Sequence, residues 1–148
     1  MLLDSSLILL DGSIDLAPAT DTPPISTTRD AATGAAVLDL RTTGWKGLAA
    51  VLVMADAASN AGDTLTAFLE ASDTEDMTGT VTGITELGKF GIADATKGII
   101  LGSEVPAIVV LRFATYKRYL RLNATVSADD SFYTVYCYVT PHPFYVVS

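Results

Sequence analysis

Apolar and polar residues alternate with a period of two along much of the chain, and helix-like periodicity is nearly absent. The clearest segments are residues 64–71, 116–126 and 132–140. Alternation of this kind is typical of strands that bury one face. We interpret 116–126 and 132–140 as the two strands of a hairpin that turns at Asp129 and Asp130. In the second of these strands, the phase predicts that Tyr133 shares a face with Val135, and that Phe132 lies on the opposite face.

Further segments have the composition of strands. Residues 48–54 are apolar on both faces, which favours a central strand. Residues 80–90 are interrupted by Gly83 and Gly88, which indicates an edge strand or a bulged strand, followed by a connection over 91–106. Shorter strands are expected at 6–10, 36–41 and 107–114. About eight strands separated by turns predict an all-β fold, an antiparallel jelly-roll-like sandwich.

Two segments do not fit the strand pattern, although we expect residues 1–148 to form a single β-sandwich domain. Residues 11–35 are rich in Ala, Thr, Ser, Asp and Pro and are longer than an ordinary loop. We predict that they form an extended N-terminal arm or loop, lying on a neighbour or on the domain itself. Residues 141–148 form an apolar C-terminal tail, which either adds a strand to its own sheet or binds a neighbouring subunit.

Composition favours surfaces that are covered by other proteins. Hydrophobic residues make up 49% of the chain and charged residues only 18%, so we expect part of the apolar surface to contact partners. The net charge of −8 argues against direct binding of nucleic acid, because phosphate contacts need Lys and Arg. A single cysteine, Cys137, fits synthesis in a reducing bacterial cytoplasm. No apolar run reaches the ~20 residues of a membrane-spanning helix.

No constellation of catalytic or metal-binding residues is apparent, and we expect neither enzymatic activity nor a cofactor. His142 is the only histidine and lies between two prolines. The carboxylates cluster in expected turns. Asp73, Glu75 and Asp76 could suggest a calcium loop, but their spacing departs from the regular pattern and favours a solvated loop.

The candidate functional residues are therefore interface residues. Tyr136 and Tyr138 share one face of their predicted strand, where they either pack on the second sheet or meet another subunit. Apolar residues near both ends and in the arm extend the set: Leu2, Leu3, Ile25, Phe144, Tyr145, Val146 and Val147.

The opening MLLDSSLILL, the arm after it and the segment RYLRLNATV of residues 118–126 resemble small cement (decoration) proteins of short-tailed bacteriophages. The most similar type is the jelly-roll cement protein of Bordetella-type phage capsids. The resemblance implies a virion structural protein on the outer capsid surface that bridges capsomers of the major capsid protein. It also implies a homo-oligomer, with a dimer favoured over a trimer, and it carries no catalytic residues.

Other virion modules remain open as alternatives, such as a tail or head-fibre adaptor or a glycan-binding tip. Trp45, between Gly44 and Gly47, is the candidate sugar-contacting residue. The alternative interpretation is that Trp45 has a structural role and packs at the edge of the sandwich.

Overall fold

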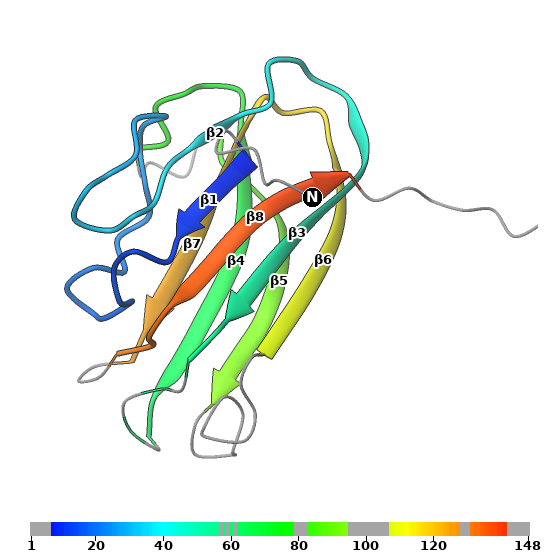
Figure 1. Cartoon of the computed structure of the whole chain (residues 1–148). Coiled ribbons are helices and arrows are strands. Elements are labelled where there is room, and N and C mark those ends of the chain that lie inside the picture. Colours follow the sequence, from blue (N-terminus) through cyan, green and yellow to red (C-terminus); the bar gives the residue numbers. More distant parts are fainter. Residues whose placement is uncertain are drawn as a thin grey trace, which may run out of the picture.

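The protein is a sandwich of two four-stranded antiparallel sheets (Figure 1). The computed structural model describes residues 7–56, 58, 60, 62–78, 83–94, 107–127 and 131–141. The strands are β1 (Ile8–Asp11), β2 (Leu38–Asp39), β3 (Trp45–Met54), β4 (Thr64–Ser72), β5 (Thr85–Asp94), β6 (Ala107–Thr115), β7 (Tyr119–Val126) and β8 (Val135–Pro141). The described ranges contain no helix, and therefore no helix that is long and apolar enough to cross a membrane.

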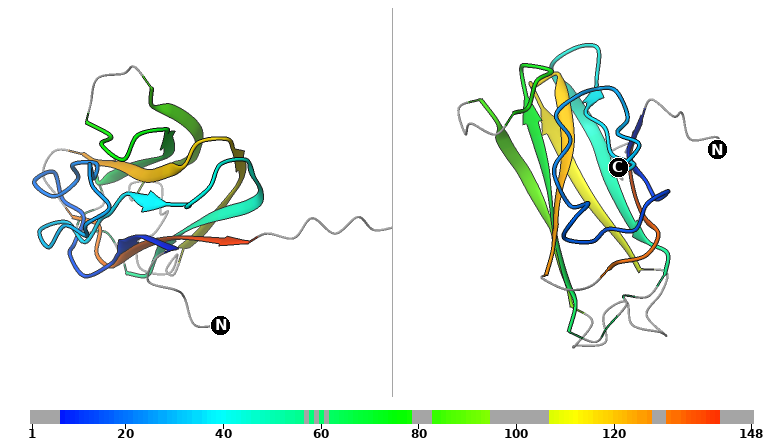
Figure 2. Two further views of the ribbon diagram at one scale, coloured as in Figure 1. Left: turned by 90° about the horizontal axis from the view of Figure 1, so that it is seen from above. Right: turned by 90° about the vertical axis from the view of Figure 1, so that its left-hand side faces the viewer.

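The strand order confirms the jelly-roll-like prediction. One sheet has the order β1-β8-β3-β6 and the other has the order β2-β7-β4-β5. The first strand therefore pairs with the last, the second with the seventh, the third with the sixth and the fourth with the fifth. This nested pairing is that of one long hairpin rolled into two layers, the arrangement of a jelly roll. Figure 2 shows the two layers from above and from one side.

The core lies between the sheets and follows the period-two pattern of the strands. In β4, Leu65, Ala67 and Leu69 are each at most 1% exposed, as the alternation predicts. Strand β3 occupies an interior position in its sheet, which confirms the prediction of a central strand. Burial of each Leu or Val side chain contributes roughly 1.5–3 kcal/mol, so these inward rows stabilise most of the packing between the layers.

The predicted hairpin of residues 116–126 and 132–140 is wrong. Strands β7 and β8 follow each other in the chain but lie in opposite sheets, where β7 pairs with β2 and β4. Period-two alternation indicates only that one face of a strand lies in the core. Because both sheets offer such a face, two adjacent alternating strands can pair with each other or lie across the core from each other.

The predicted phase at the start of β8 is also wrong. Phe132 is fully buried and makes bridges with Leu16 and Ala58, whereas Tyr133 is exposed. The cause lies at Thr134, which has a φ of 48° and so interrupts the extended backbone. The alternation restarts after this residue, and Val135 points into the core.

Strand β5 lies at the edge of its sheet and has two register shifts against β4, so the prediction of an edge or bulged strand is confirmed. Its bounds differ from the prediction, because it extends past Gly91 to Asp94. Gly91 has a φ of 107°, a conformation that glycine adopts without strain, and lies beside one of the shifts.

The structure does not show an extended arm over residues 11–35: of the two predicted positions, on a neighbour or on the domain itself, it has the second, and residues 12–37 pack on their own sandwich. They run along one edge of the two layers, as the blue and cyan loops of Figure 2 show. Leu16 exchanges backbone hydrogen bonds with Phe132, and the Asp21 carboxylate accepts the backbone N–H of Val126 at 3.1 Å. Pro24 is buried near Leu122 of β7. The segment therefore closes an edge between the sheets that the strands leave open.

Candidate functional site

The two outer faces of the sandwich differ in chemistry. The outer face of β2-β7-β4-β5 is polar and covered by the chain itself at β7 and β4, whereas Ile92 of the edge strand β5, in register with Thr66, is 52% exposed. Arg121 of β7 is only 6% exposed and donates to Glu70 of β4 and to the carbonyl oxygens of Pro24 and Met77. The Asn123 amide donates to the same carboxylate. The network therefore occupies this part of the face with the chain's own groups.

The outer face of β1-β8-β3-β6 is apolar across all four strands, and we call it the apolar face. One row across the sheet joins Ile8, Tyr138, Val51 and Val110, and the next row joins Tyr136, Val53 and Ile108. Side chains in register on neighbouring strands touch, so these rows form one continuous surface.

The apolar face is open to solvent in the part of the chain that the structure describes. Ile108 is 61% exposed and Val110 is 52% exposed, whereas Val51 is covered by its neighbours and is 7% exposed. With strands ~4.8 Å apart and a rise of ~3.4 Å per residue, the two rows and their borders occupy roughly 300 Å² of flat area. The largest apolar patch of a typical monomeric protein has about this size and is often a functional surface.

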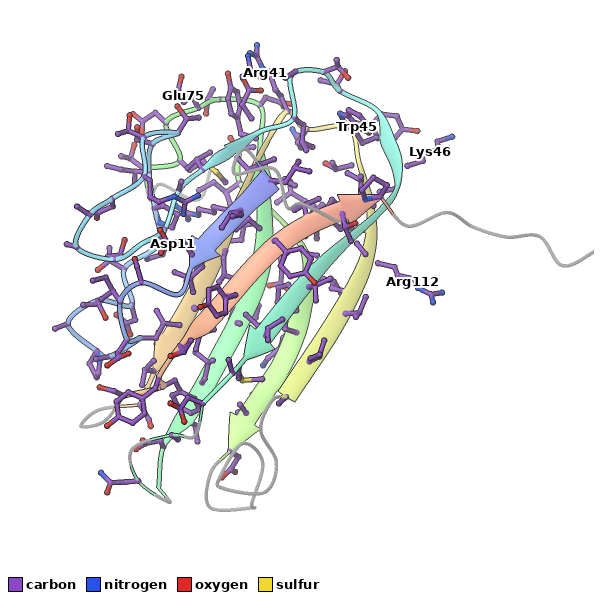
Figure 3. The ribbon with its side chains drawn as sticks, viewed as in Figure 1. Asp11, Arg41, Trp45, Lys46, Glu75 and Arg112 are labelled. Atoms are coloured by element: carbon purple, nitrogen blue, oxygen red, sulfur yellow. The ribbon has the colours of Figure 1, made fainter. Side chains whose placement is uncertain are left out.

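The charged groups beside the apolar face are basic on one side. Arg112 of β6 and Lys46 at the start of β3 project away from the body next to β6 (Figure 3). Neither has an ion-pair partner among the described residues. On the opposite side, Asp11 is engaged by Ser13 and Arg29. The face can therefore bind an apolar surface that carries acidic groups at its border.

Gly12 holds the Tyr136 ring on the apolar face. It has a φ of 68°, and three ring atoms of Tyr136 lie 2.5–2.8 Å from the position that a Cβ atom would occupy. Only a glycine allows the ring to lie this close to the backbone. The tyrosine is thus fixed in place before any partner binds.

We expect Gly12→Ala to destabilise the protein by about 1–3 kcal/mol, because the side chain would strain the left-handed backbone and displace the Tyr136 ring. Urea unfolding measures this change. Gly62→Ala is the matched control, since no atom lies within 4 Å of its added Cβ and its backbone is not left-handed. Equal stability of the two variants would contradict the packing of Tyr136 on Gly12.

The structure brings together some of the predicted interface residues and separates others. Tyr136 and Tyr138 both lie on the apolar face and point away from the second sheet, so they do not pack between the layers. Ile25 is 52% exposed but follows Pro24, whose carbonyl binds Arg121 on the other outer face. It is therefore not part of the apolar face. The other predicted residues lie outside the described ranges: Leu2, Leu3, Phe144, Tyr145, Val146 and Val147.

Sequence reasoning missed Ile108 and Val110, the two most exposed side chains of the apolar face. The signal was present, because 107–111 is apolar at both sets of alternating positions. A segment that is apolar at both sets of positions is typical of a central strand, which is the position of β3. Strand β6 is at the edge of its sheet, and its outward residues are exposed.

The described residues offer little reactive chemistry. No group of three His, Cys, Asp or Glu side chains is arranged among them to hold a metal ion. In the acidic loop, Asp73 pairs with Lys117 and Glu75 accepts a hydrogen bond from Thr27, so these groups serve as structural contacts. Burial raises the pKa of the Cys137 thiol, which keeps it protonated and unreactive. His142 lies outside the described ranges.

One carboxylate has a strongly shifted pKa. The Arg118 guanidinium donates two hydrogen bonds of 2.8 Å to Asp39, one to each carboxylate oxygen, and so lowers the pKa of Asp39 to about 2. The backbone N–H of Arg41 donates to the same group at 2.7 Å. The pair links β2 to the turn before β7 and is a structural contact.

The Asp39 pair predicts a pH dependence of stability. Because its pKa is lower in the folded protein than the usual ~3.9, the ion pair stabilises the fold above pH ~4, and this contribution is lost as the pH falls toward 2. We expect Asp39→Asn to flatten the decline in unfolding free energy between pH 4 and 2, measured by urea titration at each pH. Arg118→Gln should have the same effect. A decline as steep as that of the wild type in both variants would contradict this assignment.

The chain has no detected relative: no family model, no curated protein and no solved structure matches it.

Proposed function

We propose that the chain is a non-enzymatic virion structural protein, a cement protein that covers the outer surface of a capsid shell through its apolar face. The observation that supports this most is the contrast between the two outer faces of the sandwich. One is occupied at β7 and β4 by the Arg121 network and the chain's own loops, and the other presents Ile108, Val110 and Tyr136 to solvent across neighbouring strands. The resemblance of residues 1–10 and 118–126 to phage cement proteins is the reason for proposing a capsid shell as the partner.

The apolar face has the size expected of a weak contact that many copies make side by side on one assembly. Its roughly 300 Å² of flat area is below the ~800 Å² per partner that a stable two-protein interface buries. A single contact of this kind is therefore weak. On a shell, many copies bind side by side, and linkage between subunits raises the total affinity without new contacts. Binding only to the assembled shell stabilises that shell by mass action.

The chemistry of the face favours protein as the partner. Aromatic and branched apolar side chains with a polar or basic border are the composition of interface cores. Tyr136 is fixed by Gly12, so little side-chain entropy is lost on binding. Arg112 and Lys46 beside β6 favour an acidic rim on the coat protein, which the chain's overall net charge of −8 would otherwise repel.

The test is to add purified protein to expanded capsid shells that lack it, prepared from a phage that carries this gene. We expect saturable binding in sedimentation, and shells that rupture at higher temperature or denaturant concentration once covered. Unassembled coat protein is the control and should bind weakly. Failure to bind shells under low-salt and physiological conditions alike would contradict the proposal.

A further inference from the structure

A small apolar pocket lies at the end of the sandwich where β8 stops, and we call it the Trp45 pocket. Its apolar wall includes Leu48, Val139 and Pro141, and the Trp45 indole forms one side. The indole is held in place by a hydrogen bond of 3.3 Å from its Nε1 to the Leu40 carbonyl oxygen, and it is 40% exposed. Figure 3 shows Trp45 at this end of the molecule, near Arg41.

The dimensions of the Trp45 pocket favour a side chain as its occupant. Its volume of about 210 Å³ is below the roughly 300–1,000 Å³ of pockets that bind small organic ligands. An aromatic ring placed beside the exposed indole would gain the edge or stacking contacts that aromatic pairs make. The occupant is therefore expected to be an apolar segment with at least one aromatic residue.

We propose that the Trp45 pocket binds residues Phe144–Val147 of a second copy of this chain. This segment, Phe-Tyr-Val-Val, begins three residues after Pro141, the last residue that the structure describes, and it supplies two aromatic residues next to two branched ones. Pro141 is both the last residue of β8 and part of the pocket rim. In the chain, only two residues separate the segment from this rim.

The sequence argues that the segment fills the pocket of another copy and not its own. To enter its own pocket, the chain would have to reverse direction directly after Pro141. His142 precedes Pro143, and a residue before proline is biased toward an extended backbone. Residues 142–148 contain no Gly, Asn or Asp, the residues that most readily adopt the left-handed conformation of the tightest turns, and Pro143 fits only turns with a φ near −65°. Exchange between two copies needs no reversal.

The inference rests on the proposed function only in treating the chain as a subunit of an assembly. It concerns a contact between copies, whereas the apolar face is proposed to contact the shell. A substitution on the apolar face, such as Val110→Asp, should leave the contact between copies intact. The two proposals can therefore fail separately.

Trp45 is the only tryptophan in the chain, so its fluorescence reports occupancy of the pocket. Reporter copies keep Trp45 and carry Phe144→Asp and Val146→Asp, which should leave their own segments unable to bind. Donor copies carry Trp45→Phe and are silent at tryptophan wavelengths. We expect the emission of the reporter copies to shift to shorter wavelength when donor copies are added, because the donor segments exclude water from the indole.

The matched control is a donor that also carries Phe144→Asp and Val146→Asp, which should produce no shift. A synthetic peptide of residues 142–148 should reproduce the shift, and a peptide with the two Asp substitutions should not. Circular dichroism checks that each variant is folded. The proposal is overturned if donors and wild-type peptide leave the emission unchanged. It is also overturned if wild-type protein keeps its short-wavelength emission at dilutions where sedimentation shows a monomer, because the chain's own residues would then fill the pocket.

Discussion

Replacing Arg121 by alanine is expected to destabilise the protein by about 3–5 kcal/mol, the usual cost of removing one partner of a buried ion pair. Arg121 is 6% exposed, and its Nε donates to Glu70 at 2.7 Å. Its Nη1 also donates to the carbonyl oxygens of Met77 at 2.7 Å and Pro24 at 3.3 Å. Alanine would leave the carboxylate and both carbonyl groups without this donor.

Besides lowering the overall stability, the substitution should loosen particular segments of the protein. Arg121 joins β7 to the loop after β4 and to residues 12–37, two segments that cover the outer face of the sheet. We expect faster hydrogen exchange and faster proteolysis in both segments than in the wild type, even where the strands remain paired. Urea unfolding measures the change in overall stability, and mass spectrometry of exchanged peptides measures the change in hydrogen exchange of each segment.

The control for Arg121 is Arg118, which lies three residues earlier and also pairs with a carboxylate. The Arg118 side chain is 44% exposed, so solvent screens its pair with Asp39. Exposed pairs contribute about 0–1 kcal/mol, and Arg118→Ala should cost no more than that at pH 7. Similar losses in the two variants would show that Arg121 is not the central contact of the outer face.

Arg121 also shows where sequence reasoning stops. Its place in the alternation correctly put it on the opposite face from Leu120 and Leu122. The same pattern implied exposure, because a strand pattern separates inward from outward but does not state what covers the outward face. The covering groups come from Pro24 and Met77, which are 97 and 44 residues away in the chain. No local signal links residues at such separations.

The candidate site could likewise be predicted only in part, because alternation gives the face on which a residue lies but not the order of the strands. Period-two alternation placed Tyr136 and Tyr138 side by side, and the structure keeps them on one face. The sheet order that adds β6 to this face depends on long-range pairing, which alternation does not encode. A single left-handed residue, Thr134, was enough to invert the expected positions of Phe132 and Tyr133.

A single acidic substitution on the apolar face, Val110→Asp, is expected to weaken binding to capsid shells at least about 100-fold, or roughly 2.7 kcal/mol per site. Val110 is 52% exposed and lies in the row that continues through Val51 to Tyr138. A carboxylate placed there would lose its hydration when an apolar partner covers it.

The variant should remain folded, because exposed substitutions usually change stability by no more than about 0.5 kcal/mol. Thr125→Asp is the control: it adds the same charge to an exposed outward position on β7, in the other sheet. Shell binding of both variants is measured by sedimentation at two salt concentrations, since a general charge effect falls with salt and desolvation at the face does not. Full binding by Val110→Asp would exclude the apolar face as the shell contact. Equal, salt-sensitive losses in both variants would mean that overall charge, and not this face, decides binding.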